Sequence, residues 1–381
     1  MLLPLLAMAA CLAPVAQRPP QQRQEPQVDL VAEGHLIIAA APAKDKNLWG
    51  YQVALLAMKQ GRYSEARELW DRHLPPAGAL LKGGASAQRA RSLFQPEEAK
   101  IFFGEPHERT LAWFYRGVLH WMDGEPDNAR ACFRTAQLLD QSDESARQGD
   151  WVLLDYLDGF LTARQGGDGS DKLRRARAHA PGGASPTLPD YDTSANVMVV
   201  LQLGFGPLKR AEGRQGETLK WSGGHSTAKA ALVRSGRQTV RAPALDDVSF
   251  QAATRGARRM DALLAQKANV KQATDTVGDL GLVPGLILAQ SEGTRAAGQG
   301  LLVAAVAGKS VGGSVQPRAD TRTWNNLPQH LAFAALRLPP GRHRLSVDFL
   351  DGEGNALPAR WRELEVDVKP RGDTVLFVAD P

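Results

Sequence analysis

The stretch "WFYRGVLHWMDGEPDNARACFRTAQLLD" (residues 113–140) decides the fold of the first half of the chain, because small and aromatic residues recur in it at helical spacing. Gly117 and Ala129 are small at positions where two antiparallel helices would approach each other closely, and Gly124 breaks the chain between them. Phe133 projects back into the pair. The stretch therefore predicts a helix-turn-helix unit.

The same pattern occurs again upstream. In residues 51–74 the small, turn and aromatic positions are repeated by Ala54, Gly61, Ala66 and Trp70, and residues 151–180 give a weaker third copy with Gly159 and Gly166. In the first stretch, the matching positions are Trp113, Gly117, Gly124, Ala129, Phe133 and Ala136. These units resemble the tetratricopeptide (TPR) repeat of about 34 residues, which stacks because one unit cannot bury its own apolar face. We expect a TPR-like α-solenoid over residues 47–180.

A TPR stack has a concave groove, and the aromatic residues of this chain concentrate in its helical half. Most aromatic residues at helical spacing pack in a core. Those that remain exposed would anchor a protein partner, as aromatic side chains do at interfaces. The candidates for this groove are Trp113, Tyr115, Trp121, Trp151 and Tyr156.

The first residues indicate export. Leu2 to Ala16 carry no charge, and this run is shorter than the roughly 20 residues that span a bilayer. Residues 8–11, Met-Ala-Ala-Cys, resemble the lipobox of bacterial lipoproteins, which implies a signal peptide within residues 1–16, cleavage before Cys11 and lipid attachment to Cys11. An ordinary secretory signal cut near Ala13, or a plain apolar N-terminus, is the alternative. Residues 17–46 are expected to form a Pro/Gln-rich tether.

Charge and composition give little evidence of chemistry. The net charge is +5, and basic residues gather at 171–180 and 255–261 without interleaved aromatic residues. We interpret these runs as solvated faces with no nucleic-acid partner; if they bind anything, anionic lipid headgroups or an anionic polymer fit best. The histidines form no metal-binding pattern and no serine lies in a nucleophile elbow, so we expect no catalytic residue, metal or cofactor.

After a linker at 181–196, the sequence pattern changes from helical spacing to apolar β-branched and alternating segments. Residues 197–206 are apolar and β-branched, which predicts a buried strand, and a helix is expected from Asp246 as its N-cap. Residues 281–313 predict a close-packed or partner-facing helix. The alternating segments 343–350, 364–368 and 374–380 predict an antiparallel meander in a small sandwich. The fold class is thus α+β, with a mixed domain at 197–381.

Short motifs of this second half resemble a family of uncharacterised bacterial envelope lipoproteins with N-terminal TPR-like helices. The matching residues are Gly204, Gly206, Pro207 and Lys209, the block Asp320 to Trp324 with Leu327 and Pro328, and Pro340, Gly341 and His343. The resemblance implies export and a non-enzymatic role, and it transfers no catalytic residues.

The segment "DTRTWNNLP" (320–328) also has a physical interpretation of its own. Asp320 turns the backbone, Arg322 pairs with a carboxylate, and Trp324 fills a gap between a helix and the strands. A structural corner is therefore favoured. A ligand site made of Asp320, Arg322 and Trp324 is the alternative.

Together these patterns predict a lipid-anchored scaffold of the cell envelope that faces the periplasm, with the outer membrane favoured, and binds envelope proteins through its helical groove. One alternative is a recognition module for cell-wall or exported polysaccharide that uses Arg255, Arg258 and Arg259. The other is a hydrolase whose site carries no recognisable motif.

Overall fold

The computed structural model describes residues 28–76, 101–140, 149–180, 188–212, 218–254 and 320–380. Several predictions therefore lie outside the described residues: the signal peptide with Cys11, residues 17–27 of the tether, the basic run at 255–261 and the helix expected over 281–313. Within the described part, no helix is long and apolar enough to cross a membrane.

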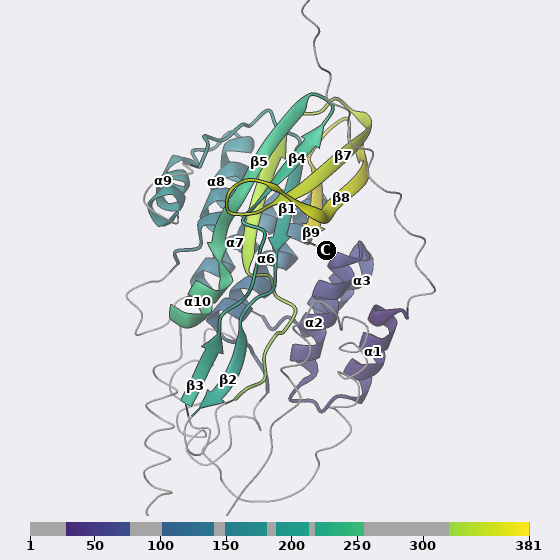
Figure 1. Cartoon of the computed structure of the whole chain (residues 1–381), viewed down its shortest axis with the longest axis vertical. Coiled ribbons are helices and arrows are strands. Elements are labelled where there is room, and N and C mark those ends of the chain that lie inside the picture. Colours follow the sequence, from purple (N-terminus) through teal and green to yellow (C-terminus); the bar gives the residue numbers. More distant parts are fainter. Residues whose placement is uncertain are drawn as a thin grey trace, which may run out of the picture.

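Three antiparallel helical hairpins follow one another along the chain (Figure 1). They are α2 (Lys46–Lys59) with α3 (Tyr63–His73), α6 (Pro106–Met122) with α7 (Pro126–Leu139), and α8 (Val152–Arg164) with α9 (Ser170–His179). The turns contain Gly61, Gly124 and Gly166, whose φ angles of 74°, 80° and 81° are costly for residues with a Cβ. The predicted turn glycines of all three units are thus confirmed.

The close approach predicted at Gly117 is also present. A Cβ placed there would lie 2.7 Å from the Phe133 ring and 3.0 Å from Cys132. Cys132 is a buried free thiol in α7. Because each hairpin contacts the next through α3 with α6 and α7 with α8, the helices form one continuous layer.

A helix occupies part of the predicted tether. Helix α1 (Leu30–Ala40) begins where the Asp29 carboxylate accepts the backbone N–H groups of Val31 and Ala32 at 3.1 and 3.0 Å. Val31 and Ile38 are buried against the core, and Gly34 lies against Val53 of α2. The prediction that 17–46 is entirely a tether is therefore wrong for residues 30–40, since their apolar content suffices to pack a helix.

The second layer is a seven-stranded sheet in the order β8-β7-β4-β5-β6-β1-β9. Its strands are β1 (Val197–Leu203), β4 (Ala230–Ser235), β5 (Gln238–Asp247), β6 (His330–Leu336), β7 (Gly341–Leu350), β8 (Ala356–Val368) and β9 (Thr374–Ala379). A separate hairpin joins β2 (Leu208–Glu212) to β3 (Thr218–Ser222). Helix α10 (Val248–Thr254) follows β5.

The predicted C-terminal meander is only half correct. Strands β7 and β8 form the expected antiparallel hairpin, but β9 crosses to the other edge of the sheet and pairs in parallel with β1. Strand β9 is apolar on both sides, with Val375 and Phe377 toward the helices and Val378 toward the opposite core. A strand that is apolar on both faces gains most from a position in which both faces are covered, as they are beside β1.

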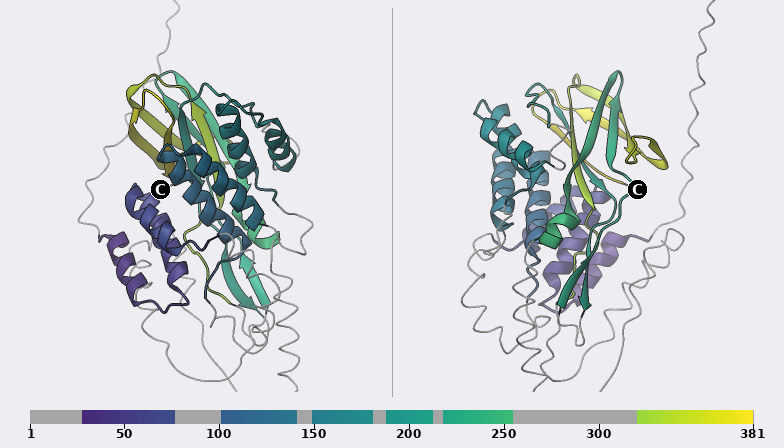
Figure 2. Two further views of the ribbon diagram at one scale, coloured as in Figure 1. Left: turned by 180° about the vertical axis from the view of Figure 1, so that it is seen from behind. Right: turned by 60° about the vertical axis from the view of Figure 1, so that its left-hand side comes forward.

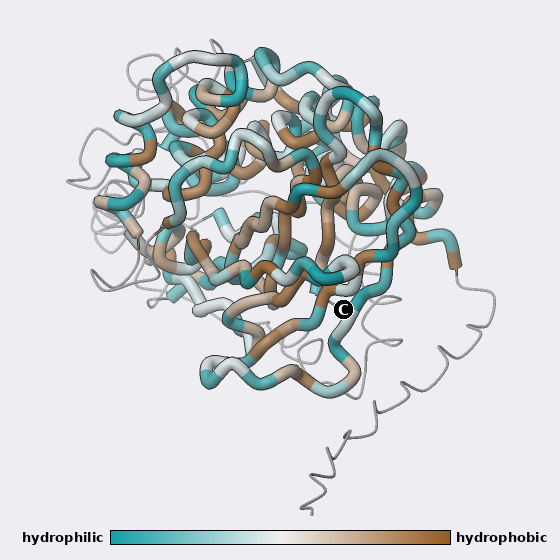
Figure 3. The backbone as a smooth tube through the Cα atoms, turned by 90° about the horizontal axis from the view of Figure 1, so that it is seen from above, coloured by the Kyte–Doolittle hydropathy of each residue, from teal (hydrophilic) through white to brown (hydrophobic). Residues whose placement is uncertain are grey.

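Strand β1 separates two cores. Val199 and Leu201 pack with residues of β6, β7 and β8 inside the curled sheet, whereas Met198 and Val200 pack against the helical layer. The sheet curls until β8 contacts β9, where Arg360 and Asp380 lie 3.2 Å apart. Figure 2 shows the helices across one face of the sheet, and Figure 3 shows hydrophobic residues gathered in the interior between the layers.

The helices and the sheet share one core, so the linker at 181–196 does not divide the chain into two separately packed domains. Tyr115 of α6 packs on Phe377 of β9 at a ring separation of 6.0 Å, and Trp121 packs on Phe333 of β6 at 6.3 Å. The α+β class is confirmed, and the arrangement is two packed layers.

The predicted helix near Asp246 begins later than expected. Asp246 is part of β5 and is buried, while the neighbouring Asp247 accepts the N–H groups of Ser249 and Phe250 at the start of α10. The capping residue is thus one position further along. Asp246 caps a different helix, because its two carboxylate oxygens accept the N–H groups of Val152 and Leu153 in α8 at 2.8 and 2.9 Å.

Candidate functional site

The aromatic residues predicted to line a groove are mostly interior. Tyr115, Trp121, Trp151 and Tyr156 are each at most 5% exposed, and Trp113 is half-buried. The chain's own sheet covers the helical face on which Tyr115 and Trp121 lie. The prediction of open partner anchors is therefore wrong for Tyr115, Trp121 and Trp151. Helical spacing identifies an apolar face, but it does not say what covers that face.

The segment 320–328 forms a corner between the two layers. Arg322 lies 2.7 Å from Asp320 and 2.8 Å from Asp45 at the start of α2, so the predicted pairing with a carboxylate is present twice. Although burial opposes the effect, the hydrogen bonds and charge of Arg322 hold the pKa of Asp320 below its ordinary value. The guanidinium of Arg322 is thus engaged by two carboxylates within the fold.

Trp324 fills the gap between the helices of the first two hairpins. Its ring is fully buried and lies 5.2 Å from Tyr51 and 5.6 Å from Trp70. The indole N–H donates to Asn326 at 2.6 Å, and the backbone N–H donates to Glu108 at 2.8 Å. Because the ring is enclosed and its polar groups are satisfied, this segment is a structural corner rather than an open ligand site.

Lys209 connects the same corner to β2. Its side chain is 1% exposed, and its ammonium lies 3.1 Å from Glu105 and 3.6 Å from Glu108. Burial raises the pKa of Glu108, whereas the two carboxylates raise the pKa of Lys209 against the effect of its own burial. Lys209 and the segment that holds Arg322 and Trp324, which are far apart in sequence, thus meet at one buried charge cluster. The acidic partners Glu105 and Glu108 were not predicted; the capping box that they form at the start of α6 is the sequence signal that could have identified them.

The basic residues of α9 are paired rather than free. Lys172 lies 3.2 Å from Asp155 and 3.1 Å from Asp158, and Arg175 lies 3.3 Å from Asp155. Both aspartates are buried in α8. The solvated basic face expected over 171–180 is present, since Arg174, Arg175 and Arg177 are exposed, but part of its positive charge also neutralises carboxylates of the neighbouring helix.

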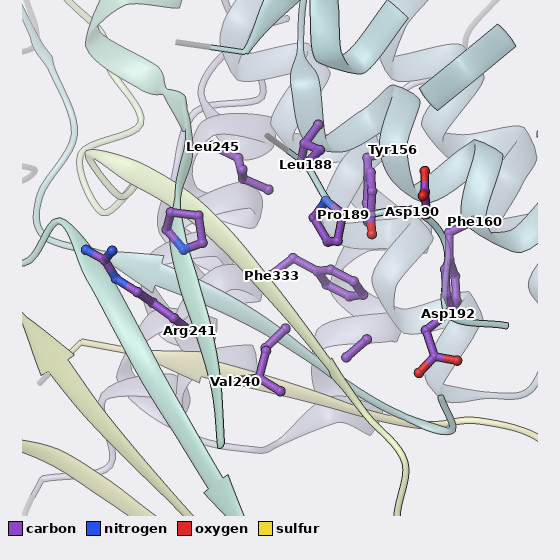
Figure 4. A pocket seen from close by; sticks show the side chains of 13 residues that line it. Tyr156, Phe160, Leu188, Pro189, Asp190, Asp192, Val240, Arg241, Leu245 and Phe333 are labelled. Carbon is purple, nitrogen blue, oxygen red and sulfur yellow. The ribbon is translucent and has the colours of Figure 1, made fainter. Parts of the chain in front are cut away.

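A cavity of about 320 Å³ lies where α8, residues 188–192 and strands β5 and β6 meet (Figure 4). Its floor is apolar, formed by Tyr156, Phe160, Leu188, Val240, Leu245 and Phe333. Tyr156 is thus the one member of the predicted aromatic set that lines this opening. The volume is at the lower end of the range found for ligand sites in proteins.

Charges of both signs surround this floor. Asp190 and Asp192 lie on the loop side and Arg241 on the strand side (Figure 4). Asp190 pairs with Arg177 at 2.9 Å, and hydrogen bonds from the Ser194 side chain and backbone lower the pKa of Asp192. Arg241 makes no ion pair within the described residues. The cavity therefore has an apolar floor between the Asp192 carboxylate and the Arg241 guanidinium.

The described residues contain no group of three or more His, Cys, Asp or Glu side chains that could hold a metal ion. Burial raises the pKa of the Cys132 thiol to about 11, which makes it a poor nucleophile at neutral pH. No family model, curated protein or solved structure matches this chain.

Proposed function

We propose that the protein is a non-enzymatic, lipid-anchored scaffold of the cell envelope that binds a protein partner. In this proposal acyl chains on Cys11 hold it to a membrane, with the outer membrane favoured, and its folded body faces the periplasm. The Met-Ala-Ala-Cys sequence at 8–11 supports the anchor. Several acyl chains would be needed, because one chain alone binds a membrane weakly.

The observation that carries the binding role is the cavity between α8 and strands β5 and β6. The predicted TPR-like groove would have used the aromatic helical face, but that face packs on the sheet. The glycine turns and close helix pairs support a TPR-like origin for the hairpins. We therefore assign the partner site to the cavity at the edge of the helical layer, where α8 and the sheet leave a space between them.

The chemistry of the cavity favours a short peptide segment of the partner. An apolar side chain would fill the floor beside Tyr156 and Phe333, and a basic neighbour would face Asp192 while an acidic one would face Arg241. A polysaccharide is the second candidate, but sugars stack on open ring faces. Phe160 and Phe333 are only 1% and 8% exposed, so they offer little stacking surface.

Two measurements test this function. Replacing Cys11 by Ser should move the protein out of the membrane fraction. A photo-reactive side chain in place of Val240 should form an adduct with an envelope protein, which Ala335→Phe abolishes by filling the cavity and Ala335→Ser leaves intact. An adduct of equal yield in both Ala335 variants would contradict the assigned site, and an adduct with polysaccharide would favour the second candidate.

A further inference from the structure

A second cavity, of about 470 Å³, lies between α1, the start of α2 and the end of α3. Its lining includes His35, Lys46, Arg72 and His73 and contains no carboxylate. These side chains come from three different helices, so the fold, rather than a run in the sequence, collects them. Such a concentration of basic groups around a hollow is a site for an anion.

Two of the basic side chains in this cleft, Lys46 and Arg72, are not engaged elsewhere in the described structure. Lys46 and Arg72 make no ion pair within the described part of the chain, unlike the basic residues of α9. Two carboxylates from the surrounding elements are already engaged: Glu65 pairs with Arg62 at 2.6 Å and with His35 at 3.6 Å, and Asp45 pairs with Arg322. An anion entering the cleft would therefore meet two uncompensated cations.

His73 provides an independent indication of a ligand. It is only 6% exposed, and its Nε2 atom has no hydrogen-bond partner in the described residues. Burial, together with Arg72, Lys46 and His35, lowers the pKa of His73, so the neutral ring keeps one N–H to donate. A buried polar atom without a partner is costly unless something binds it.

The start of α2 also faces this cleft, through Lys46 and Asn47. Asp45 precedes the helix but makes no side-chain cap bond, since its carboxylate is held by Arg322. The first backbone N–H groups of a helix carry partial positive charge and bind phosphate well. An anion held beside Lys46 would therefore lie near this partial positive charge.

An apolar helix face borders the cleft. Leu36 of α1 is 71% exposed, and Ala32 and Ala40, one turn away on either side, are exposed too. Val28, just before the helix, is 60% exposed. An exposed apolar stripe beside basic groups is the arrangement of helices that lie in a membrane interface.

We propose that α1 and this cleft form a docking surface for a membrane containing anionic lipid, with a lipid phosphate held by Lys46, Arg72 and His73 and with Leu36 in the interface. The proposal rests on the lipid anchor at Cys11. Val28 follows Cys11 by seventeen residues, a length that even fully extended spans at most about 60 Å. The anchor would therefore keep α1, the first described helix, close to the bilayer.

The test uses the full chain with Cys11→Ser, so that binding to vesicles does not depend on lipidation and any contribution of the leader is the same in every variant. Vesicles contain 30% phosphatidylglycerol in phosphatidylcholine, with pure phosphatidylcholine for comparison. Lys46→Gln with Arg72→Gln should weaken binding to the anionic vesicles roughly 30-fold. The matched control, Arg174→Gln with Arg344→Gln, removes the same charge from exposed positions elsewhere and should bind like the parent.

Leu36→Ser should weaken binding about tenfold through lost apolar contact, with an unchanged melting temperature because Leu36 is exposed. Equal binding by the cleft variant and its matched control would overturn the proposal. So would binding of inorganic phosphate to the cleft with no effect of the cleft variant on vesicles, since that indicates a free-anion site. An unmodified Cys11 in the native chain would instead contradict the anchor, and the vesicle result is independent of it.

Discussion

The carboxylate of Asp246, at the end of β5, accepts the backbone N–H of Val152, the first residue of α8, at 2.8 Å. This contact joins the two layers next to the cavity that we propose as the partner site, because α8 supplies Tyr156 and β5 supplies Leu245 to its floor. The orientation of α8 against the sheet thus depends in part on one buried acid.

The first prediction concerns the pH dependence of this contact. Burial, despite the two N–H bonds and assisted by Asp150 and Asp140, raises the pKa of Asp246 from 3.8 to about 7. Since the folded pKa is above the unfolded one, the contribution to stability is full below about pH 4 and is lost as pH rises through 7. The full loss over this pH range is on the order of 4 kcal/mol. Asp246→Asn cannot titrate, so its unfolding free energy relative to the parent should improve between pH 5 and pH 8. A constant difference would show that Asp246 does not titrate there.

The second prediction concerns Trp324, which is fully enclosed by Tyr51, Trp70 and Tyr115. Trp324→Ala should lower the unfolding free energy by about 3 to 5 kcal/mol, because the cavity left behind adds to the lost burial. Trp324→Phe should cost clearly less, since it keeps most of the ring volume. Chemical denaturation measures both. If Trp324→Ala cost less than about 1 kcal/mol, the corner would not be a packed part of the core.

A third prediction follows from the buried ion pairs of Lys209. Lys209→Met leaves the enclosed Glu108 carboxylate without its cation and should destabilise the fold by about 3 to 5 kcal/mol. Adding Glu108→Gln to Lys209→Met removes the stranded charge and should recover part of that loss. A double-mutant cycle measures the coupling. Strictly additive effects of the two substitutions would mean that the pair does not interact.

The fourth prediction tests the close helix pair that the repeat pattern identified. Gly117→Ala brings a Cβ to 2.7 Å from Phe133, and we expect a net loss of about 1 to 3 kcal/mol despite the better helix propensity of alanine. Gly117→Ala with Phe133→Leu relieves the contact and should cost less than the two single substitutions together. Thermal melts of the four proteins suffice. A Gly117→Ala variant more stable than the parent would contradict the close approach.

Local features of the fold could be predicted from the sequence because their causes are local. Gly61, Gly124 and Gly166 mark turns, since a positive φ at a helical break selects glycine within a few residues. The β7–β8 hairpin follows from alternation and a glycine-rich turn. Arg322 and Trp324 were placed in a structural corner for similar reasons, as residue types that rarely stay unpaired or exposed.

Long-range features could not be predicted in this way. The pairing of β9 with β1 depends on where in the assembled sheet both apolar faces of β9 can be covered. No single segment of the sequence encodes that position. Asp246 caps a helix that lies some ninety residues earlier in the chain. Tyr115 and Trp121 belong to an apolar stripe whose cover is the chain's own sheet rather than a partner. Both candidate cavities likewise combine side chains from elements distant in sequence.

The central claim is that the protein is held to a membrane through Cys11, and the mass of its mature N-terminus tests this most directly. The native chain and Cys11→Ser would be expressed in a Gram-negative host, fractionated and measured by intact mass spectrometry. We predict a membrane-bound native protein that begins at Cys11 and carries the added mass of acyl chains, and an unmodified Cys11→Ser protein lost from that fraction. A native chain that retains Met1 and carries no added mass would contradict the account.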